Sequence, residues 1–296
     1  MTRYRVEHET VYEYGGPVAI SHNELRLVPR RLEHQALLDF AMSIDPLPET
    51  ISGRRDYFGN EVIFVSLGEP HARLAITARS RVERSAPAPA RPEASPAWED
   101  VAAAVRREIA PPWLEALEFV FPSPFAPLAA ELAAYAKPCF PPRRALLVGF
   151  AELCARIHRE FAYDPEATSL STPVLDVLRE RRGVCQDFAH LAIGCLRSLG
   201  LPARYVSGYV RTRRAETPAG ERELLGSDAS HAWVSAFCPV NGWVDFDPTN
   251  DVLAADRHVT LAWGRDYDDV SPVKGVTVGG GTQLMSVRVE LVPSEA

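Results

Sequence analysis

Apolar and polar side chains alternate along much of the first 84 residues. The even positions from Tyr4 to Tyr14 are mostly aromatic or β-branched, while positions 5, 7, 9 and 13 are charged. A period of two is that of a β-strand with one buried face. Gly15-Gly16-Pro17 should end this first strand, because glycine and proline interrupt regular structure.

The same alternation returns in three shorter stretches. Residues 24–27, 62–67 and 73–79 each read as strands, and Phe58-Gly59-Asn60 supplies a turn before the second of them. We therefore predict a small antiparallel β-rich domain over residues 1–85. Residues 86–97 are rich in proline and alanine and poor in large apolar side chains, which favours a semi-rigid linker. The remaining residues, 98–296, would form a second domain.

In the second domain the apolar period changes to that of helices. Residues 144–161 give the clearest pattern, and residues 98–109, 127–136 and 185–199 are further candidates. Thr172-Pro173 is a helix start, and Gly183 ends that helix. Strands are expected at 203–210, 231–238, 242–246, 257–263 and 283–292, with an exposed loop at 211–229 and a hairpin turn at 279–281. The expected class is α+β.

Composition narrows the class of protein. The chain has 296 residues, of which 46% are hydrophobic and 24% charged, enough for a sizeable core without disulfides or a structural metal. A net charge of −7 and a pI near 5.7 argue against a nucleic-acid partner. The sequence shows neither a signal-peptide pattern nor an apolar run of about 18 residues. We therefore expect a cytoplasmic protein with no membrane partner; no pattern specifies an oligomeric state.

One of five cysteines stands out by its position. None of the five has a paired spacing, so neither a disulfide framework nor a zinc knuckle is indicated. Cys154 falls on the apolar stripe of its helix, which favours a core role. Cys185 opens a helix, where unpaired backbone N–H groups and the helix dipole stabilise a thiolate. The same N–H groups could hold an oxyanion. Asp187, in the first turn, would oppose thiolate formation if it pointed at the sulfur.

Two further residues complete a candidate constellation. His231 opens a predicted strand and Asp247 ends the next one, one short hairpin later. Taken singly, the histidine could simply pack and the aspartate could form a turn. Together with Cys185 they match a nucleophile, a base and a carboxylate that orients the base. Asp245 competes with Asp247 for the last role, because the two would share a face of a regular strand.

At these residues the chain resembles the transglutaminase-like superfamily of papain-type cysteine enzymes. The resemblance rests on GVCQDFAHLAIGCLRSLGLPARYVSGY, HAWVSAF and GWVDFDPTN, in that order, and covers roughly residues 143–265. The β-rich start, with its DYFGN turn, resembles the bacterial N-terminal region that often precedes this core. The resemblance implies helices packed on an antiparallel sheet. It assigns Cys185 as nucleophile, His231 as base and Asp247, rather than Asp245, as the orienting residue.

The resemblance also implies a chemistry. Classical members form a thioester with a glutamine side chain, release ammonia and pass the acyl group to an amine, whereas water gives deamidation or proteolysis. Animal members hold the oxyanion with a tryptophan upstream of the cysteine, but residues 161–185 contain none. Tyr163 is the candidate substitute, and Gln186 the candidate cleft residue. No cofactor is implied, and Asp266, Asp268 and Asp269 lack the spacing of a calcium loop.

We therefore expect a cysteine acyl-transfer enzyme that acts on amide bonds of a peptide or protein substrate. A peptidase or amidase with the same triad is one alternative, since only the acceptor differs. A non-catalytic peptide-binding module is another. The intact cysteine, histidine and aspartate disfavour it, because binding alone does not need that set.

Overall fold

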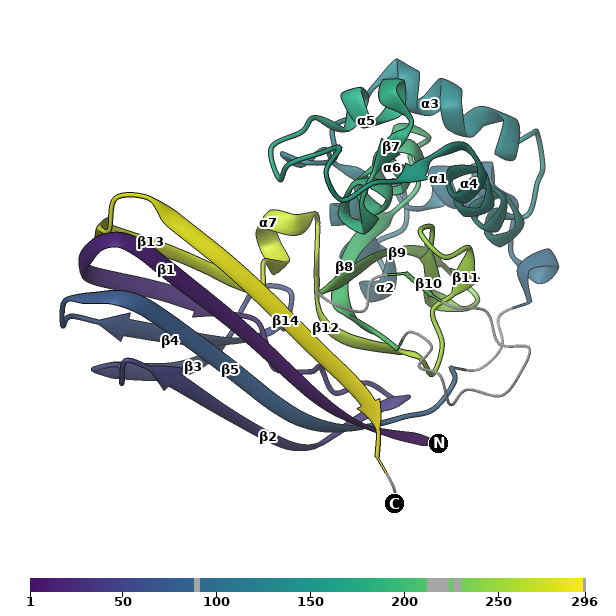
Figure 1. The fold of residues 1–296 in the computed structure, drawn as a ribbon. Coiled ribbons are helices and arrows are strands. Elements are labelled where there is room, and N and C mark those ends of the chain that lie inside the picture. Colours follow the sequence, from purple (N-terminus) through teal and green to yellow (C-terminus); the bar gives the residue numbers. More distant parts are fainter. Residues whose placement is uncertain (88–90, 212–223, 226–229, 295–296) are drawn as a thin grey trace.

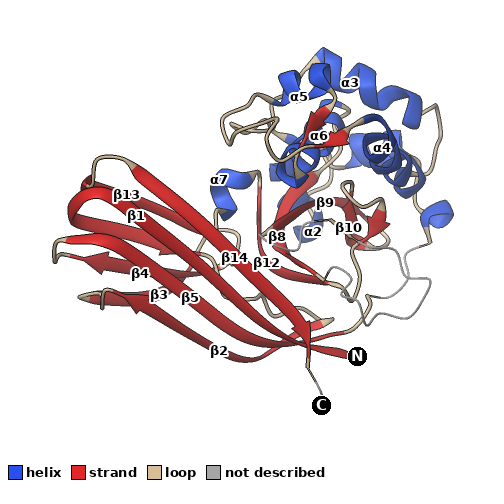
Figure 2. Cartoon of the chain, in the orientation of Figure 1, coloured by secondary structure: helices blue, strands red, loops and turns tan. Residues whose placement is uncertain are grey.

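The computed structural model describes residues 1–87, 91–211, 224–225 and 230–294. Two units lie side by side, one made of a large bent sheet and the other of helices around a smaller sheet (Figures 1 and 2). The predicted α+β class is confirmed. The predicted exposed loop at 211–229 falls largely outside the described residues, as do residues 88–90 of the predicted linker.

The first unit is a seven-stranded antiparallel sheet centred on one long strand, β1. Its members are β1 (Thr2–Leu25), β2 (Gln35–Asp45), β3 (Thr50–Arg55), β4 (Glu61–Leu67), β5 (His71–Arg84), β13 (Val273–Gly279) and β14 (Gln283–Pro293). The first part of β1 pairs with β5 and β14, and the last part pairs with β4 and β13. The strands predicted at 62–67 and 73–79 are present as β4 and part of β5. Residues 24–27 form no separate strand, since β1 ends at Leu25, and β2 and β3 were not predicted.

The prediction that Gly15-Gly16-Pro17 ends the first strand is wrong. β1 continues through these residues, and its pairing partners change there, so that the sheet bends instead of stopping (Figure 1). The prediction of a hairpin turn at 279–281 is also wrong. β13 and β14 both pair with β1. Gly279, which ends β13, and the next two glycines are all at positive φ and lie opposite the bend. Gly16 donates to the Gly280 carbonyl at 3.0 Å.

The C-terminal boundary of the predicted second domain needs correction. β13 and β14 complete the first sheet, so residues 273–293 belong to the N-terminal unit instead of to a unit spanning 98–296. Tyr4 pairs with Pro293, which brings the two chain ends together (Figure 1). The end of the predicted linker is also packed: Ser95 and Ala97 are buried, and the Ser95 hydroxyl accepts a hydrogen bond from the Leu147 backbone at 3.0 Å.

The second unit contains a five-stranded antiparallel sheet in the order β11-β10-β9-β8-β12. Its strands are β8 (Ala203–Val210), β9 (His231–Cys238), β10 (Gly242–Asp247), β11 (Val252–Leu253) and β12 (His258–Gly264), and β6 (Ala162–Tyr163) pairs separately with β7 (Arg182–Gly183). The helices are α1 (Trp98–Ala104), α2 (Pro111–Leu117), α3 (Ala130–Ala136), α4 (Leu146–Glu160), α5 (Val174–Glu180), α6 (Cys185–Ser198) and α7 (Tyr267–Val270). Short 3₁₀ turns occupy Pro92–Ala94, Glu118–Val120 and Lys137–Cys139.

Most of these elements follow the predicted pattern, but two helices are shorter than predicted. The helix predicted at 98–109 ends at Ala104, and the helix predicted between Thr172-Pro173 and Gly183 has Pro173 as its N-cap and ends at Glu180. Pro111-Pro112 opens α2, a helix that the apolar pattern did not predict. Proline suits the first helical turn, because its fixed φ fits a helix and its missing N–H would have no partner there.

Helix α6 lies at the centre of this unit, against β8 and β9 (Figure 2). Nearly every α6 side chain is buried, including Phe188, Leu191 and Leu196. The same apolar cluster includes Tyr4 and Val289 from the large sheet, so the two units share one core. None of the helices that the structure describes is both long and apolar enough to cross a membrane.

Candidate active site

Cys185 is the first residue of α6 and lies 9% exposed. The chain reaches it through Val184, which is extended (φ −114°, ψ 179°). The Asp187 carboxylate turns back toward this entry: it accepts the Val184 N–H at 2.8 Å and the Thr168 hydroxyl at 2.6 Å. Asp187 is therefore engaged in fixing the start of the helix. Burial raises the pKa of its carboxyl, against the lowering effect of these two bonds.

His231 opens β9, where it pairs with Gly208 of β8, and its imidazole is fully buried. Its Nε2 lies 2.8 Å from the Asp247 Oδ2. Its other ring nitrogen, Nδ1, has no hydrogen-bond partner among the described atoms. One nitrogen is thus held by a carboxylate and the other is left for a reacting group.

The Asp247 carboxylate accepts more hydrogen bonds than the sequence suggested. Oδ1 accepts the backbone N–H groups of Thr249 and Asn250 at 3.0 and 3.2 Å. Oδ2 accepts from the Asn250 side chain at 2.7 Å and lies 3.1 Å from the Nε2 of His258, a residue of β12. Four residues therefore converge on one buried carboxylate, including His231.

Asp245, the competitor for the orienting position, faces elsewhere. Its Oδ2 accepts the Trp233 indole N–H at 3.1 Å. Of the two aspartates of β10, only Asp247 contacts His231 among the described residues.

These contacts polarise the site. Burial alone would raise the pKa of the Asp247 carboxyl, but His231 and His258 hold this pKa well below its usual range. Burial opposes the charged form of His231, but the Asp247 carboxylate and the Cys185 sulfur together raise the pKa of its imidazole. The arrangement favours an imidazolium next to Cys185 and an ionised Asp247 behind it.

Tyr163 and Gln186 were the weaker candidates from the sequence. Tyr163 ends β6 and pairs with Gly183, two residues before the cysteine. Burial, with the nearby Cys185 and Asp247, raises the pKa of its phenol to about 12, so the hydroxyl keeps its proton at neutral pH. Gln186 is the second residue of α6 and is half-buried beside Cys185.

His231, Asp247 and His258 also have the residue types of a metal site, with ligand atoms all within 4.8 Å of one another. The hydrogen-bond geometry fits an Asp247 carboxylate that accepts hydrogen bonds better than one that binds a metal cation. Both histidine Nε2 atoms and the Asn250 amide nitrogen lie within 3.1 Å of the same carboxylate oxygen. An amide nitrogen can only donate, so a metal at this point would face an N–H group instead of a lone pair.

Sequence analysis missed His258 and Asn250. Asn250 closes the DPTN segment, whose turn character was the only available signal. His258 opens a strand with no chemical motif around it, and only strand pairing brings it to Asp247. Burial lowers the pKa of His258, partly offset by Asp247, so it is the neutral member of the cluster.

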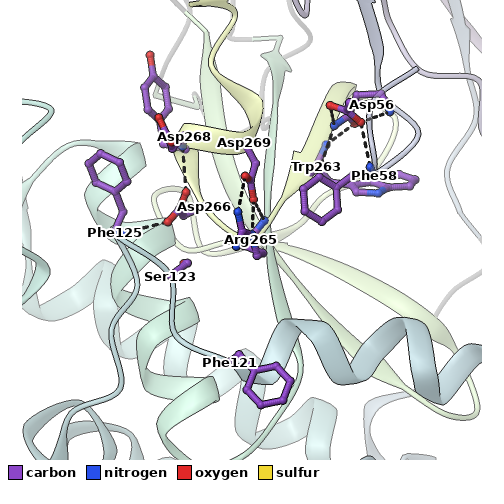
Figure 3. A network of polar contacts seen from close by, with 12 residues as sticks. Asp56, Phe58, Phe121, Ser123, Phe125, Trp263, Arg265, Asp266, Asp268 and Asp269 are labelled. Carbon is purple, nitrogen blue, oxygen red and sulfur yellow. Dashed lines mark hydrogen bonds and ion pairs between the residues drawn. The ribbon is translucent and has the colours of Figure 1, made fainter. Parts of the chain in front are cut away.

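The acidic residues around α7 have structural roles. Asp266 is buried, caps α7 through the Asp268 N–H and accepts the Phe125 N–H at 3.0 Å (Figure 3). Asp269 pairs with Arg265 at 2.9 Å, and Asp268 with Lys274 at 2.7 Å. Each carboxylate therefore has a protein partner.

Comparison with known proteins places this site in a family. A family model described as the bacterial transglutaminase-like N-terminal region matches residues 4–83, and one for the transglutaminase-like superfamily matches residues 145–248. An uncharacterized protein of Mycobacterium tuberculosis is 39% identical over 99% of this chain and 93% of its own length. One of Mycobacterium leprae is 35% identical over 98% and 99%. The chain belongs to the transglutaminase-like superfamily, which confirms the resemblance seen in the sequence.

Two further relatives have names that mention chemistry. A protein-glutamine gamma-glutamyltransferase of Pseudomonas aeruginosa is 36% identical over 148 residues, which is 46% of this chain and 22% of that protein. A solved structure of a candidate cysteine protease from Cytophaga hutchinsonii superposes with a TM-score of 0.76 at 20% identity, covering 100% of this chain and 91% of the other. At that identity the likeness establishes the shared fold.

Proposed function

We propose that the protein is a cysteine acyl-transfer enzyme that attacks amide carbonyls of peptides or proteins through Cys185. The observation that carries this proposal is the buried imidazole of His231, bonded to Asp247 on one side and without a partner on the other. The Nδ1 of His258 is also buried without a partner, but of the two histidines His231 is the one whose pKa is raised by the neighbouring Cys185 sulfur. The position of Cys185 at a helix N-terminus supplies the matching nucleophile.

The proposed cycle uses only groups of the chain. The Cys185 thiolate attacks the amide carbonyl carbon, forming a C–S bond and an oxyanion. His231 gives its proton to the departing amine as the C–N bond breaks, which leaves a thioester and a neutral imidazole. Water or a second amine then attacks, His231 takes the proton of that nucleophile, and the thiolate leaves.

The oxyanion would be held by the start of α6. Backbone N–H groups in a first helical turn have no intrahelical acceptor and point outward along the axis. The Tyr163 hydroxyl, which retains its proton at neutral pH, is the candidate second donor. Gln186 would line the cleft next to it.

A cysteine peptidase or amidase is the second candidate, because the fold matches that of a candidate cysteine protease over the whole chain. The two candidates share every step up to the thioester. Product analysis by mass spectrometry, with and without an added primary amine, separates them. An amine adduct indicates transfer, and hydrolysis alone indicates the peptidase.

The first test is the rate of Cys185 alkylation by iodoacetamide between pH 5 and 9, read by mass spectrometry of the Cys185 peptide. In the wild type we expect fast alkylation that persists below pH 7, because the His231 cation stabilises the thiolate. His231→Ala should lower the rate below pH 7 by about tenfold or more, since a one-unit change in proton affinity is tenfold. His22→Ala, at an exposed histidine, is the matched control.

Equal pH profiles in the wild type and His231→Ala would count against the proposed ion pair. A peptide that binds persistently without turnover would favour the binding module instead.

A further inference from the structure

A cavity of about 620 Å³ lies where the two units meet. Tyr57 and Phe58 line it from the turn between β3 and β4, and the helical unit contributes the remaining wall. Those wall residues are Leu114, Glu115, Glu118, Phe119, Arg204, Trp243 and Trp263. The volume lies within the roughly 300–1,000 Å³ that small-molecule sites occupy.

Arg204 is a buried cation in this cavity, and its contacts do not account for its charge. Its side chain, 7% exposed, is stacked between two indoles, with its guanidinium carbon 4.2 Å from the Trp243 ring centre and 3.8 Å from that of Trp263. Stacking occupies the two faces of the guanidinium and leaves its N–H edges. Among the described residues, its Nε has no hydrogen-bond partner, and its carboxylate neighbours act on it only through charge.

The nearest charged groups do not neutralise the Arg204 guanidinium through a hydrogen bond. Asp245 and Glu115 offset its charge only at a distance, since the Asp245 carboxylate is bonded to Trp233. Arg30 adds positive charge, because its guanidinium carbon lies 3.4 Å from the ring centre of Trp263 as well. A buried cation without a hydrogen-bonded anion is costly, so the cavity is short of one anionic group.

The cavity wall is fixed in place by the DYFGN turn. Asp56 accepts the N–H groups of Phe58 and Asn60 at 3.0 and 2.9 Å. Asn60 in turn bonds both backbone groups of Trp263, at 2.9 and 3.0 Å. Figure 3 shows Phe58 and Trp263 joined through this cluster. The site is therefore preformed by contacts between the units.

We propose that this cavity binds a carboxylate carried on an apolar, aromatic-sized body. The carboxylate would bond the N–H edge of Arg204, which suits planar two-oxygen acceptors, and the apolar body would lie among Phe58, Phe119 and Trp243. Glu115 and Glu118, toward the exposed side of the cavity, disfavour a second anionic group at the outer end of the ligand. A peptide C-terminus ending in an aromatic residue and a free aromatic acid share this chemistry.

The cavity is separate from Cys185. Along β8, Gly208 pairs with His231 and Arg204 with Ser235, so the two sites are four positions apart, roughly 13 Å along the strand. The inference therefore goes beyond the proposed function and holds whether or not Cys185 is catalytic.

The test is calorimetric titration of the full chain carrying Cys185→Ser, which prevents turnover of the probes. N-acetylphenylalanine should bind about tenfold or more tightly than N-acetylphenylalaninamide, because only the acid offers a carboxylate to Arg204. 3-Phenylpropanoate, which lacks the peptide group, distinguishes a free aromatic acid from a peptide C-terminus. Binding as tight as that of N-acetylphenylalanine indicates a free aromatic acid, and weaker binding indicates a peptide C-terminus.

Variants locate the binding. Arg204→Met, close in volume, should abolish the preference for the acid. Leu114→Trp, at a half-exposed lining residue, should weaken both probes without disturbing the buried stack, and serves if Arg204→Met fails to fold. Glu115→Gln should leave the affinity for the amide unchanged, and this variant should bind the acid at least as tightly as the protein with Glu115 does. Equal affinity for acid and amide, no heat with either, or an acid preference that survives Arg204→Met would overturn the proposal.

Discussion

At the scale of single residues, the unexpected feature is the crowding of donors on Asp247. His231, His258 and Asn250 side chains and two backbone N–H groups all converge on its carboxylate. Charge-assisted bonds of this kind hold a buried carboxylate ionised and fix its rotamer. The orientation of the His231 ring thus depends on groups that hold the carboxylate from other sides. Asn250 also lies 3.5 Å from the His231 Nε2, and His258 comes from a separate strand.

Replacing His258 tests this dependence. His258→Leu removes one donor from Asp247, so we expect kcat on an amide substrate to fall about tenfold with KM little changed, since a bond to a charged group is worth roughly 1.5–3 kcal/mol. His258→Gln, which can still donate, should recover most of the loss. A merely structural role would instead lower the midpoint of urea unfolding in both variants while leaving the alkylation profile of Cys185 unchanged.

At the scale of elements, the start of α6 depends on close packing at Gly183. A Cβ on this glycine would lie 2.6 Å from the Asp187 Oδ2 and 3.0 Å from the Asp187 Cβ. Gly183→Ala should therefore displace Asp187, break its bond to the Val184 N–H and shift the first turn that carries Cys185.

We expect Gly183→Ala to lower the free energy of unfolding by about 1–2 kcal/mol, as loss of a helix cap does, and to slow Cys185 alkylation at pH 6. Gly53→Ala is the control, because nothing lies within 4 Å of a Cβ added at that position. Equal stability and alkylation in the two variants would show that Asp187 does not position the helix start.

The elements also show what local pattern can predict. Strand β9 begins and ends where it was predicted, and α6 differs from its predicted bounds by one residue, because the apolar pattern of each is a local property of the chain. The bend in β1 and the pairing of β14 with it were not predictable, since they join residues more than 250 positions apart. The approach of His258 to Asp247, only 11 positions away, was missed because it depends on strand order, which periodicity does not encode.

At the scale of the whole molecule, the two units are joined by a buried polar contact within their shared core. His8 of β1 lies with its Nδ1 2.9 Å from the Tyr209 hydroxyl of β8 and its Nε2 2.9 Å from the Thr10 hydroxyl. Burial lowers the pKa of His8 to about 4, against 6.5 for the free side chain. The folded protein therefore keeps this histidine neutral at a pH where the unfolded chain would protonate it.

The junction should make folding stability depend on pH. Between pH 6.5 and 4 the unfolded chain binds a proton at His8 that the folded chain does not, so acidification favours unfolding across this window, by on the order of 3 kcal/mol at its lower end. His8→Gln, which keeps a hydrogen-bond donor and an acceptor, should remove the contribution of His8 to this pH dependence. We expect the difference in unfolding free energy between wild type and variant, measured in urea, to shift in favour of the variant from pH 7 to pH 4.5. Other buried histidines such as His190 titrate in both proteins and cancel in that difference, so parallel pH profiles would mean that His8 is solvated or protonated in the folded junction.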